Sequence, residues 1–362
     1  MTELERARLI INECDDVMRE AFEKRMEAVR QVALYKKEHG LPVEDISREE
    51  EMIKRQSGLV ESEELRSYYV NLLRANIDVS KSFQHKLLDG MRVAYSGVPG
   101  AFANIVAERV FPDAVHMPYS DFDKAYSAVE KGECDAAVLP IENSFNGDVG
   151  KVMDLAFFGT LFVNGVWEAE IVQNLLANSG ATLSTIKKVI SHPQALGQCA
   201  AFIEKHGFET EERVNTAVAA EEVAKSGRLD LAAIASEEAA EKFSLVKLEG
   251  HINSASNNTT RFAVFSRAKR QPTTKDNHFI MLFTVKNQAG SLGRAISVIG
   301  EYGFNLKALK SRPTKELVWD YYFYAEGEGN IASEEGRRMR EELKKCCSDI
   351  KVLGSFEKEM KI

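Results

Sequence analysis

The first 39 residues contain no glycine or proline, and this uninterrupted stretch constrains the fold more than any other feature of the chain. A helix over residues 2–39 would be roughly 57 Å long at a rise of ~1.5 Å per residue. A compact single-chain domain of about 90 residues cannot cover such a helix. Apolar residues recur along it at spacings of three, four and seven: Leu4, Ile11, Cys14, Met18, Phe22, Val29 and Val32. We therefore predict that a second chain supplies the partner surface.

The rest of the first 90 residues is also predicted to be helical. Of the 23 glycines and eight prolines in the chain, this region holds four: Gly40, Pro42, Gly58 and Gly90. The segment from Gly40 to Pro42 interrupts the first helix, because glycine and proline disfavour helical geometry. A short helix then runs to about residue 56, and a third covers residues 62–88. Residues 1–90 are assigned to an all-α domain.

From Met91 the pattern changes to short β-rich runs that alternate with helical segments. The runs MRVAYSG, CDAAVLPI and KKVISHP are separated by stretches such as FDKAYSAVEKG and VAAEEVAKSG. Such alternation is typical of an α/β domain, which we assign to residues 91–270. The polar segment QPTTKDN, residues 271–277, is a linker.

The last segment, residues 271–362, has a different order of elements. Strands are predicted over residues 278–287, 304–312, 316–326 and 350–356, and helices over residues 291–303 and 333–347. The order βαββαβ is that of a ferredoxin-like α+β domain. The chain is therefore predicted to hold three domains.

Composition excludes several classes of protein. Hydrophobic residues make up 44% of the chain and charged residues 28%, which is ordinary for a globular protein. No apolar run approaches the ~18 residues of a membrane span. The N-terminus MTELERARLI lacks the apolar core and cleavage site of a secretory signal. We predict a cytoplasmic protein without membrane contact.

Cysteine usage and charge exclude further classes. The five cysteines are scattered and form no C-x-x-C pair, so neither a disulfide framework nor a metal site is predicted. The formal charge is -8, and no segment gathers Lys and Arg without interleaved acids, so nucleic acid is not a predicted partner. A small anionic ligand remains compatible with the sequence, since a few arginines can serve one pocket.

Two cations of the first helix lie on its apolar face. Arg25 and Lys36 are eleven residues apart, and at ~100° per residue they are about 20° out of phase. Buried charge is costly unless paired, so one interpretation is that an anionic ligand binds there. The alternative is that both side chains snorkel or pair with acids of neighbouring helices. Arg8 lies ~25 Å from Arg25 along the axis and cannot easily serve the same pocket within one subunit.

Other polar residues of this domain recur at helical spacing. Asp45, Arg48 and Glu49 share one face, as do Ser80 and Gln84, although capping or solvation would also explain them. Together these positions resemble the all-helical chorismate mutases. The resemblance implies one pocket lined by Arg25, Lys36, Asp45, Arg48, Glu49, Ser80 and Gln84, with Arg8 contributed by the partner subunit.

The chemistry of that family explains the set. Chorismate carries two carboxylates, which arginines can hold by bidentate pairing. Its rearrangement to prephenate is pericyclic and places negative charge on the ether oxygen, so hydrogen-bond donors suffice and no nucleophile is needed. The resemblance puts Lys36 and Gln84 at that oxygen.

Three polar clusters of the middle domain lie beside predicted strands. PIENSFNGDV (residues 140–149) follows AAVL, SHPQALGQC (191–199) follows KKVI, and NNTTRFAVF (257–265) leads into a strand. The carboxyl ends of strands are where open α/β sheets bind ligands. Turn and cap chemistry is the alternative explanation for any one cluster. Gly97 and Gly100 do not form G-x-G-x-x-G, which argues against a nicotinamide site.

In this order the clusters resemble prephenate dehydratase, and the likeness extends over residues 91–270. It implies a fold like a type 2 periplasmic binding protein, with the substrate between two α/β lobes. The family motifs place eight residues at or near the cleft: Glu142, Asn143, Ser144, Ser191, Gln198, Thr260, Arg261 and Phe262.

The dehydratase must donate a proton or a strong hydrogen bond to the departing hydroxyl while the ring carboxylate leaves as carbon dioxide. Thr260 is the donor that the resemblance implies. Glu142, with its pKa raised by burial, is a rival source of the proton. His192 is a third candidate, for which packing beside Pro193 at a turn is the preferred interpretation.

The C-terminal motifs NQAGSLGRA and LKSRPT resemble those of an ACT domain, whose ligand in dehydratases is phenylalanine. The resemblance implies an effector site formed by Gly290, Ser291, Leu292, Ser311, Arg312 and Pro313. A plain strand-to-helix turn is the alternative for Gly290. Two positions depart from the family: Ser291 replaces alanine, and Lys310 replaces the glutamate that precedes Ser-Arg-Pro.

These resemblances together imply a cofactor-free, bifunctional chorismate mutase and prephenate dehydratase. Its expected partners are chorismate, prephenate, phenylalanine as an inhibitor, and further copies of itself in a homodimer or larger homo-oligomer. Three alternatives are a ligand-sensing protein with lapsed catalytic centres, a mutase joined to a dehydrogenase, and a dehydratase that uses arogenate. The dehydrogenase would need a dinucleotide fingerprint that is absent from the sequence.

Overall fold

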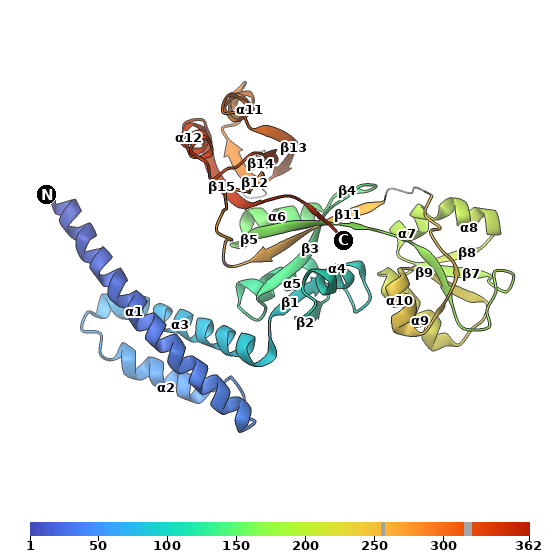
Figure 1. Cartoon of the computed structure of the whole chain (residues 1–362), viewed down its shortest axis with the longest axis horizontal. Helices are drawn as coiled ribbons and strands as arrows, with labels where there is room; N and C mark the ends of the chain where they lie inside the picture. Colours follow the sequence, from blue (N-terminus) through green and yellow to red (C-terminus); the bar gives the residue numbers. More distant parts are fainter. Residues whose placement is uncertain (255–257, 315–320) are drawn as a thin grey trace. The chain divides into compact units, whose positions relative to one another are not determined.

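The computed structural model describes residues 1–254, 258–314 and 321–362 of the chain. The chain divides into two compact units, Met1–Arg92 with Asp113–Val115, and Val93–Pro112 with His116–Ile362. In Figure 1 the blue helices belong to the first unit, and the β-sheets occupy the green to red part of the chain. Within the described residues, no helix combines the length and apolar character that a membrane span requires.

Three helices make up the first unit: α1 (Glu3–Glu38), α2 (Ile46–Ser57) and α3 (Glu63–Asp89). A capping box starts α1, in which the side chains of Thr2 and Glu5 accept from each other's backbone N–H groups. Gly90, with a φ of 84°, follows the end of α3 and takes a conformation that favours glycine. The predicted helical character of the first 90 residues is confirmed.

The apolar stripe of α1 is covered over part of its length. The C-terminal half of α1 packs on α3, where Arg25 contacts Ser80 and Arg30 lies over the Phe83 ring. The buried apolar residues of these two helices include Ala33 of α1 with Leu73 and Ile77 of α3. Towards the N-terminus, Leu4 and Ile11 are 60% and 57% exposed. Exposed apolar surface of this extent on one helix face is typical of a contact surface.

The second unit contains a seven-stranded sheet in which two strands carry site residues. These are β3 (Ala136–Asn143) and β11 (Thr259–Ser266), which are adjacent and antiparallel. The order is β16-β5-β11-β3-β1-β2, with β4 paired to β3. The other strands are β1 (Arg92–Ser96), β2 (Val115–Tyr119), β4 (Gly147–Asp148), β5 (Phe162–Glu170) and β16 (Met360–Lys361). The helices of this lobe are α4 (Phe102–Val110), α5 (Phe122–Glu130) and α6 (Gly150–Phe158).

A five-stranded sheet forms a second lobe, drawn in yellow-green in Figure 1. Its order is β10 (Val246–Glu249), β6 (Asn174–Ala177), β9 (Leu231–Ala235), β7 (Lys188–Ser191) and β8 (Glu209–Glu212). Its helices are α7 (Pro193–Gln198), α8 (Ala200–His206), α9 (Thr216–Ser226) and α10 (Glu237–Phe243). The chain leaves this lobe beside the point where it enters, since the Ile171 amide donates to the Asn258 carbonyl at 2.8 Å.

The C-terminal elements follow the predicted order βαββαβ. They are β12 (His278–Val285), α11 (Ser291–Glu301), β13 (Asn305–Pro313), β14 (Tyr321–Glu328), α12 (Glu334–Leu343) and β15 (Cys347–Phe356). The sheet order is β13-β14-β12-β15, which is ferredoxin-like. Of the strand predicted over residues 316–326, residues 316–320 lie outside the described residues, as does Asn257 of the third polar cluster.

This ferredoxin-like domain contacts the seven-stranded sheet through backbone. A side chain at Gly354 of β15 would collide with the Val163 carbonyl of β5, so glycine permits the close approach. After β15 the chain continues to β16, which pairs in parallel with Trp167 and Glu168 of β5. The last strand of the chain therefore extends the sheet that carries the site residues.

Candidate active sites

In the helical unit, buried polar side chains gather between α1 and α3. Ser80 and Gln84 of α3 are both buried, and the guanidinium of Arg25 donates to the Ser80 hydroxyl. Burial lowers the pKa of Arg25, and no carboxylate among the described residues pairs with it. Gln84 Nε2 lies 3.4 Å from the Ser80 carbonyl, whereas its Oε1 has no partner in the described structure. This arrangement leaves a cation and a buried amide available to a ligand.

The remaining predicted residues of this unit lie around the α1–α2 loop or on the surface. Lys36 Nζ donates to the Val43 carbonyl at 2.6 Å, and Lys36 forms no ion pair among the described residues. Asp45 caps a helix, since its carboxylate accepts from the Arg48 amide at 3.2 Å. Glu49 forms an ion pair with Lys81 at 3.1 Å. The side chains of Arg8 and Arg48 are exposed. The carboxylate partners considered for Arg25 and Lys36 are thus not observed.

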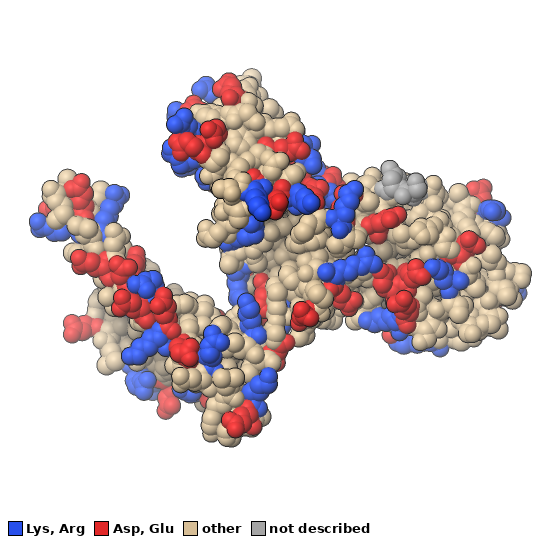
Figure 2. Space-filling model, in the orientation of Figure 1, with Lys and Arg blue, Asp and Glu red and all other residues tan. Residues whose placement is uncertain are grey.

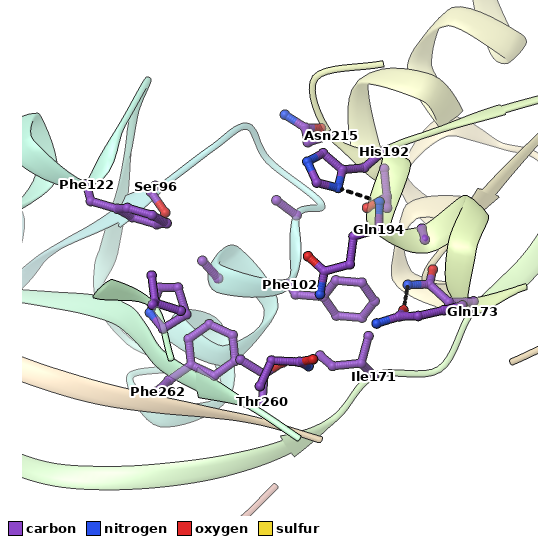
Figure 3. A pocket seen from close by; sticks show the side chains of 18 residues that line it. Ser96, Phe102, Phe122, Ile171, Gln173, His192, Gln194, Asn215, Thr260 and Phe262 are labelled. Atoms are coloured by element: carbon purple, nitrogen blue, oxygen red, sulfur yellow. Dashed lines mark hydrogen bonds between the residues drawn. The ribbon is translucent and has the colours of Figure 1, made fainter. Parts of the chain in front are cut away.

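A cavity of about 370 Å³ lies between the two lobes of the second unit. Its volume falls within the range of small-molecule sites. Figure 3 shows Thr260 and Phe262 on one side, with His192 and Asn215 opposite and Gln173 beside the connecting segment. None of the described residues that line it is Lys, Arg, Asp or Glu.

Strand alternation decides which residues of β3 and β11 reach the cavity. Thr260 is opposite Asn143, and Phe262 is opposite Pro140; all four line the cavity. Directly opposed residues of antiparallel strands point to the same face, and successive residues point to opposite faces. The register shifts between Arg261 and Phe262, so that Asn143 and Pro140, three residues apart on β3, both reach the cavity. Arg261, opposite Glu142 on β3, is accordingly turned away from the cavity.

A chain of side-chain amides joins Thr260 to the second lobe. Asn143 Nδ2 donates to Thr260 Oγ1 at 2.9 Å and to Asn258 Oδ1 at 3.0 Å. Asn258 Nδ2 donates to Gln198 Oε1 at 3.0 Å, and Gln173 Nε2 lies 3.4 Å from the same atom. Because Thr260 accepts from Asn143, its own hydroxyl proton can be directed into the cavity. Gln198 Nε2 is buried and has no partner in the described structure.

His192 begins the short helix α7 and lines the cavity. Its Nδ1 accepts from the Gln194 amide at 3.2 Å, so the neutral ring carries its proton on Nε2. Burial lowers the pKa of His192, with Glu212 acting in the opposite direction. The ring is therefore neutral near pH 7 and offers one N–H donor.

On the opposite face of the sheet, charged side chains connect it to the ferredoxin-like domain. Glu142 accepts from Lys310 at 2.8 Å and from Arg261 at 2.7 Å, and Lys310 also contacts Asp148 at 2.5 Å. Arg261 further pairs with Glu326 of β14. In Figure 2, basic and acidic side chains lie interleaved where Figure 1 draws β15 beside α6.

Comparisons with known proteins agree with this division. Residues 7–85 match the family model for chorismate mutase type II, and residues 93–270 match that for prephenate dehydratase. A bifunctional chorismate mutase/prephenate dehydratase of Aquifex aeolicus is 29% identical over 99% of both chains. The chain belongs to the bifunctional chorismate mutase/prephenate dehydratase family. The predicted combination of a mutase domain and a dehydratase domain in one enzyme is confirmed.

Two further relatives concern the dehydratase part. An arogenate dehydratase/prephenate dehydratase of Arabidopsis thaliana is 34% identical over 74% of this chain and 72% of its own length. A prephenate dehydratase of Arthrobacter aurescens, solved in complex with L-Phe, is 25% identical with a TM-score of 0.69. That match covers 74% of this chain and 90% of the solved one.

Four of the eight predicted dehydratase residues line the cavity: Asn143, Gln198, Thr260 and Phe262. The fully buried Ser191 hydroxyl instead donates to the Ile234 carbonyl at 2.6 Å, which fixes the end of β7 on β9. Ser144 Oγ accepts from the Thr259 amide at 2.9 Å and joins β11 to the turn after β3. Both serines hold the strands that carry the site.

Glu142 and Arg261 are not brought to the dehydratase cavity, because alternation turns them to the opposite face. Burial alone would raise the pKa of Glu142, as expected from the sequence. Hydrogen bonds from Lys310 and Arg261 outweigh burial, and the pKa of Glu142 is lowered. The interpretation of Glu142 as a proton source is therefore wrong for this arrangement, in which it is an ionised partner of two cations.

Several cavity residues were not predicted. Gln173 and Asn215 contribute amides, and Phe102 and Phe122 contribute apolar walls. Asn215 lies three residues after the end of β8 and caps α9, so the rule that placed the first two clusters would also have found it. Gln173 lies in the crossing between lobes, for which the sequence carries no comparable signal.

The predicted effector residues lie at two places in the ferredoxin-like domain. Gly290, Ser291 and Leu292 begin α11, and Gly290 has a φ of 84°. Ser311, Arg312 and Pro313 end β13. Arg312 pairs with Asp154 of α6 at 2.8 Å, so its guanidinium contacts the dehydratase domain.

Proposed function

We propose that the helical unit converts chorismate to prephenate and that the cavity between the two lobes converts prephenate to phenylpyruvate. The observation that carries the proposal is that each site holds a buried glutamine with an amide atom left unpartnered among the described residues, Gln84 in one and Gln198 in the other. Buried polar atoms are normally satisfied, so a polar ligand is the natural partner in both places.

The mutase site acts by holding its substrate and stabilising charge. Arg25 binds a carboxylate, and Lys36 donates to the ether oxygen as its bond breaks, together with the Nε2 hydrogen of Gln84 that Ser80 does not use. Gln84 Oε1 remains as an acceptor for the substrate. One Nζ hydrogen of Lys36 is used by Val43, which leaves two hydrogens for the substrate. The uncovered stripe of α1 supports a homodimer in which Arg8 completes the partner's site.

In the dehydratase, the carbon–carbon bond to the ring carboxylate breaks, and its electron pair forms a ring double bond as the hydroxyl leaves. One proton is taken up, and the hydroxyl departs as water. Thr260 donates the hydrogen bond that stabilises the departing oxygen. The absence of Lys and Arg from the described lining leaves the ring carboxylate without a stabilising ion pair, which favours its loss.

Prephenate is the substrate that this lining favours over arogenate. The two differ at the side chain, where arogenate carries an ammonium group in place of the keto oxygen. An ammonium is a hydrogen-bond donor, whereas the unpartnered Gln198 Nε2 of the described lining is itself a donor and therefore suits an acceptor. The amides of Gln198 and Asn215 can instead donate to a keto group.

We also propose that the ferredoxin-like domain is an ACT domain that brings phenylalanine inhibition to the dehydratase. The L-Phe complex of the Arthrobacter aurescens relative supports this proposal. Lys310 joins the domain to Glu142 of β3, and Glu326 joins it to Arg261 of β11, the strand that carries Thr260. Domain boundaries at residues 90 and 270 remain predictions from the sequence.

One assay tests the assignment. The full chain is given chorismate, and the formation of prephenate and then phenylpyruvate is followed with and without phenylalanine. Both products are expected, with the second step inhibited by millimolar phenylalanine. Accumulation of prephenate alone would leave the dehydratase unsupported, and a higher kcat/KM for arogenate than for prephenate would contradict the substrate assignment.

The lowered pKa of His192 predicts the pH dependence of the dehydratase. The neutral ring caps α7 and donates from Nε2, so protonation removes the cap by occupying Nδ1. Because the pKa is lowered, activity is expected to hold down to about pH 6.5, the ordinary value of histidine, and to fall only below it. His192→Asn, which can still cap a helix, should lose this acid limb of kcat/KM. If kcat/KM of the variant still falls at acid pH as in the unmodified chain, another group is responsible for the pH dependence.

Lys310→Glu is expected to destabilise the contact between the dehydratase and ferredoxin-like domains. The substitution would place three carboxylates together, since Lys310 lies between Glu142 and Asp148 and is 15% exposed. A loss of about 3 kcal/mol in unfolding free energy is typical for disrupting a partly buried pair. Lys307→Glu, at an exposed position of the same strand, is the control and should change little. The second substitution Asp148→Lys, added to Lys310→Glu, should restore part of the lost unfolding free energy. If it restores none, the loss does not come from the ion pair between these two residues.

A further inference from the structure

A second hollow, of about 300 Å³, lies between the ferredoxin-like domain and the seven-stranded sheet. It shares no lining residue with the dehydratase cavity. Its lining includes Arg340 of α12 and Lys269, which lies three residues after the end of β11. The hollow therefore joins two domains at a place that neither catalytic step uses.

Its lining carries an excess of positive charge. The lining contains four cations: Lys269, Arg340, Lys344 and Lys351. It contains one carboxylate, that of Glu341, although the net charge of the chain is -8. Glu341 is already bound by Lys344 at 3.0 Å, and both side chains are more than half exposed, so this pair lies at the rim. Among the described residues, the other three cations form no ion pair.

The hydrogen bonds that these cations already form do not use all of their N–H donors. Lys351 Nζ is used by the Ala156 and Gly159 carbonyls at 2.9 and 2.5 Å. Lys269 Nζ donates once, to the Val352 carbonyl at 3.2 Å, and Arg340 donates through Nε to the Gly336 carbonyl at 3.3 Å. Two hydrogens of Lys269 and the terminal nitrogens of Arg340 therefore remain for an acceptor in the hollow.

The pKa of Lys269 indicates that no nearby carboxylate compensates its charge. Burial lowers the pKa of Lys269, and the nearby Arg340 lowers it further. Two cations that repel each other in a partly desolvated hollow are stabilised when an anion is bound between them. Both the open hydrogen-bond donors and the unpaired charges therefore favour a bound anion in the hollow.

The rest of the lining is apolar. Phe162, Ile350 and Val352 form a wall, and the Phe162 ring centroid lies 5.9 Å from Lys269 Nζ. An inorganic anion would leave this wall uncovered, whereas an aromatic or branched carboxylate would cover it and still reach the cations.

We propose that this hollow binds a small organic carboxylate with an apolar body, whose carboxylate lies between Lys269 and Arg340 and whose body packs on Phe162. Because the two cations belong to different domains, such a ligand stabilises the contact between the dehydratase and ferredoxin-like domains in proportion to its occupancy. The site is separate from the predicted effector residues around Gly290 and Ser311.

Isothermal titration of the full chain with 3-phenylpropionate tests the proposal. Arg340→Gln and Lys269→Met should each weaken a binding component by about tenfold or more, the loss of one charge-assisted contact. Arg338→Gln is the matched control, since Arg338 lies on the same helix, pairs with Glu334 and does not line the hollow. It should bind within about twofold of the unmodified chain.

Two further measurements, thermal unfolding of the variants and titration with inorganic phosphate, complete the test. Thermal unfolding checks that each variant is folded; Arg340→Gln, at the helix surface, remains informative if Lys269→Met is not. Inorganic phosphate should bind at least about tenfold more weakly than 3-phenylpropionate, because it cannot cover the apolar wall. Equal binding of phosphate, equal binding by all three variants, or no binding of 3-phenylpropionate at millimolar concentration would each overturn the proposal.

Discussion

Thr260→Val should abolish dehydratase turnover while the mutase of the same chain continues at its normal rate. Valine has nearly the shape of threonine, so the buried end of β11 is preserved, but the hydroxyl that donates to the departing oxygen is lost. Removal of one such donor or proton-transfer group typically lowers kcat by about 10²- to 10⁴-fold. Asn143 would keep acceptors at Asn258 Oδ1 and the Thr259 carbonyl, so the rest of the network need not move.

The measurement is phenylpyruvate formation from prephenate, with kcat and KM determined separately. A role in the transition state lowers kcat and leaves KM within a few-fold, whereas a structural role would also disturb substrate binding. Thr260→Ser retains the hydroxyl and should keep most of the activity. Chorismate turnover by the variant confirms that the chain is folded. If Thr260→Val kept kcat within about tenfold of normal, the donor would have to be sought elsewhere, first at His192.

The position of Thr260 could be predicted more reliably than the roles of its neighbours. The sequence analysis assigns Thr260, Arg261 and Phe262 of the cluster NNTTRFAVF to the cleft. Strand alternation separates them: Thr260 and Phe262 line the cavity, and Arg261 lies on the other face. The same reasoning separates Asn143 from Glu142. Residues 259–266, TTRFAVFS, show no alternation of polar and apolar residues that would reveal which of them share a face. Which face meets the substrate depends on packing between lobes that are distant along the chain.

Glu142 illustrates why the charge state of a residue could not be obtained from its local sequence. Burial was foreseen, and burial alone raises the pKa of a carboxyl group. Its deciding partner, Lys310, lies 168 residues further along the chain. The charge reversal at Lys310 was visible as a departure from the family, and the structure gives it a physical reason, since Lys310 contacts two carboxylates of the dehydratase domain.

The fold was more predictable than the site, because its signals are local. The long helix α1 and the order βαββαβ follow from breaker positions and periodicity over ten to forty residues. The two-residue strands β4 and β16 carry no such signal: β4 pairs with the end of β3 that extends beyond β1, and β16 pairs with the edge of β5. Similarly, Asp45 was expected in the mutase pocket, and its carboxylate caps α2 in the single chain.

Lys36→Met is expected to lower mutase kcat by about 10²- to 10³-fold, the usual effect of removing a donor aimed at developing charge. The negative charge on the ether oxygen appears only as its bond breaks, so the interaction is stronger in the transition state than with bound chorismate. KM should therefore change by no more than a few-fold. The dehydratase, measured with prephenate, serves as an internal control for folding.

Lys37→Met provides the matched comparison. Lys37 is the neighbouring residue on α1 and is exposed, so the same chemical change there leaves the α1–α3 pocket untouched. A structural role for Lys36 would act through its hydrogen bond to the Val43 carbonyl, and its loss would lower stability and raise KM. A large fall in kcat at constant KM and unchanged thermal stability separates catalysis from anchoring. Equal kcat values for the two variants would contradict the placement of Lys36 at the ether oxygen, and with it the interpretation of the inward-facing cations as a substrate site.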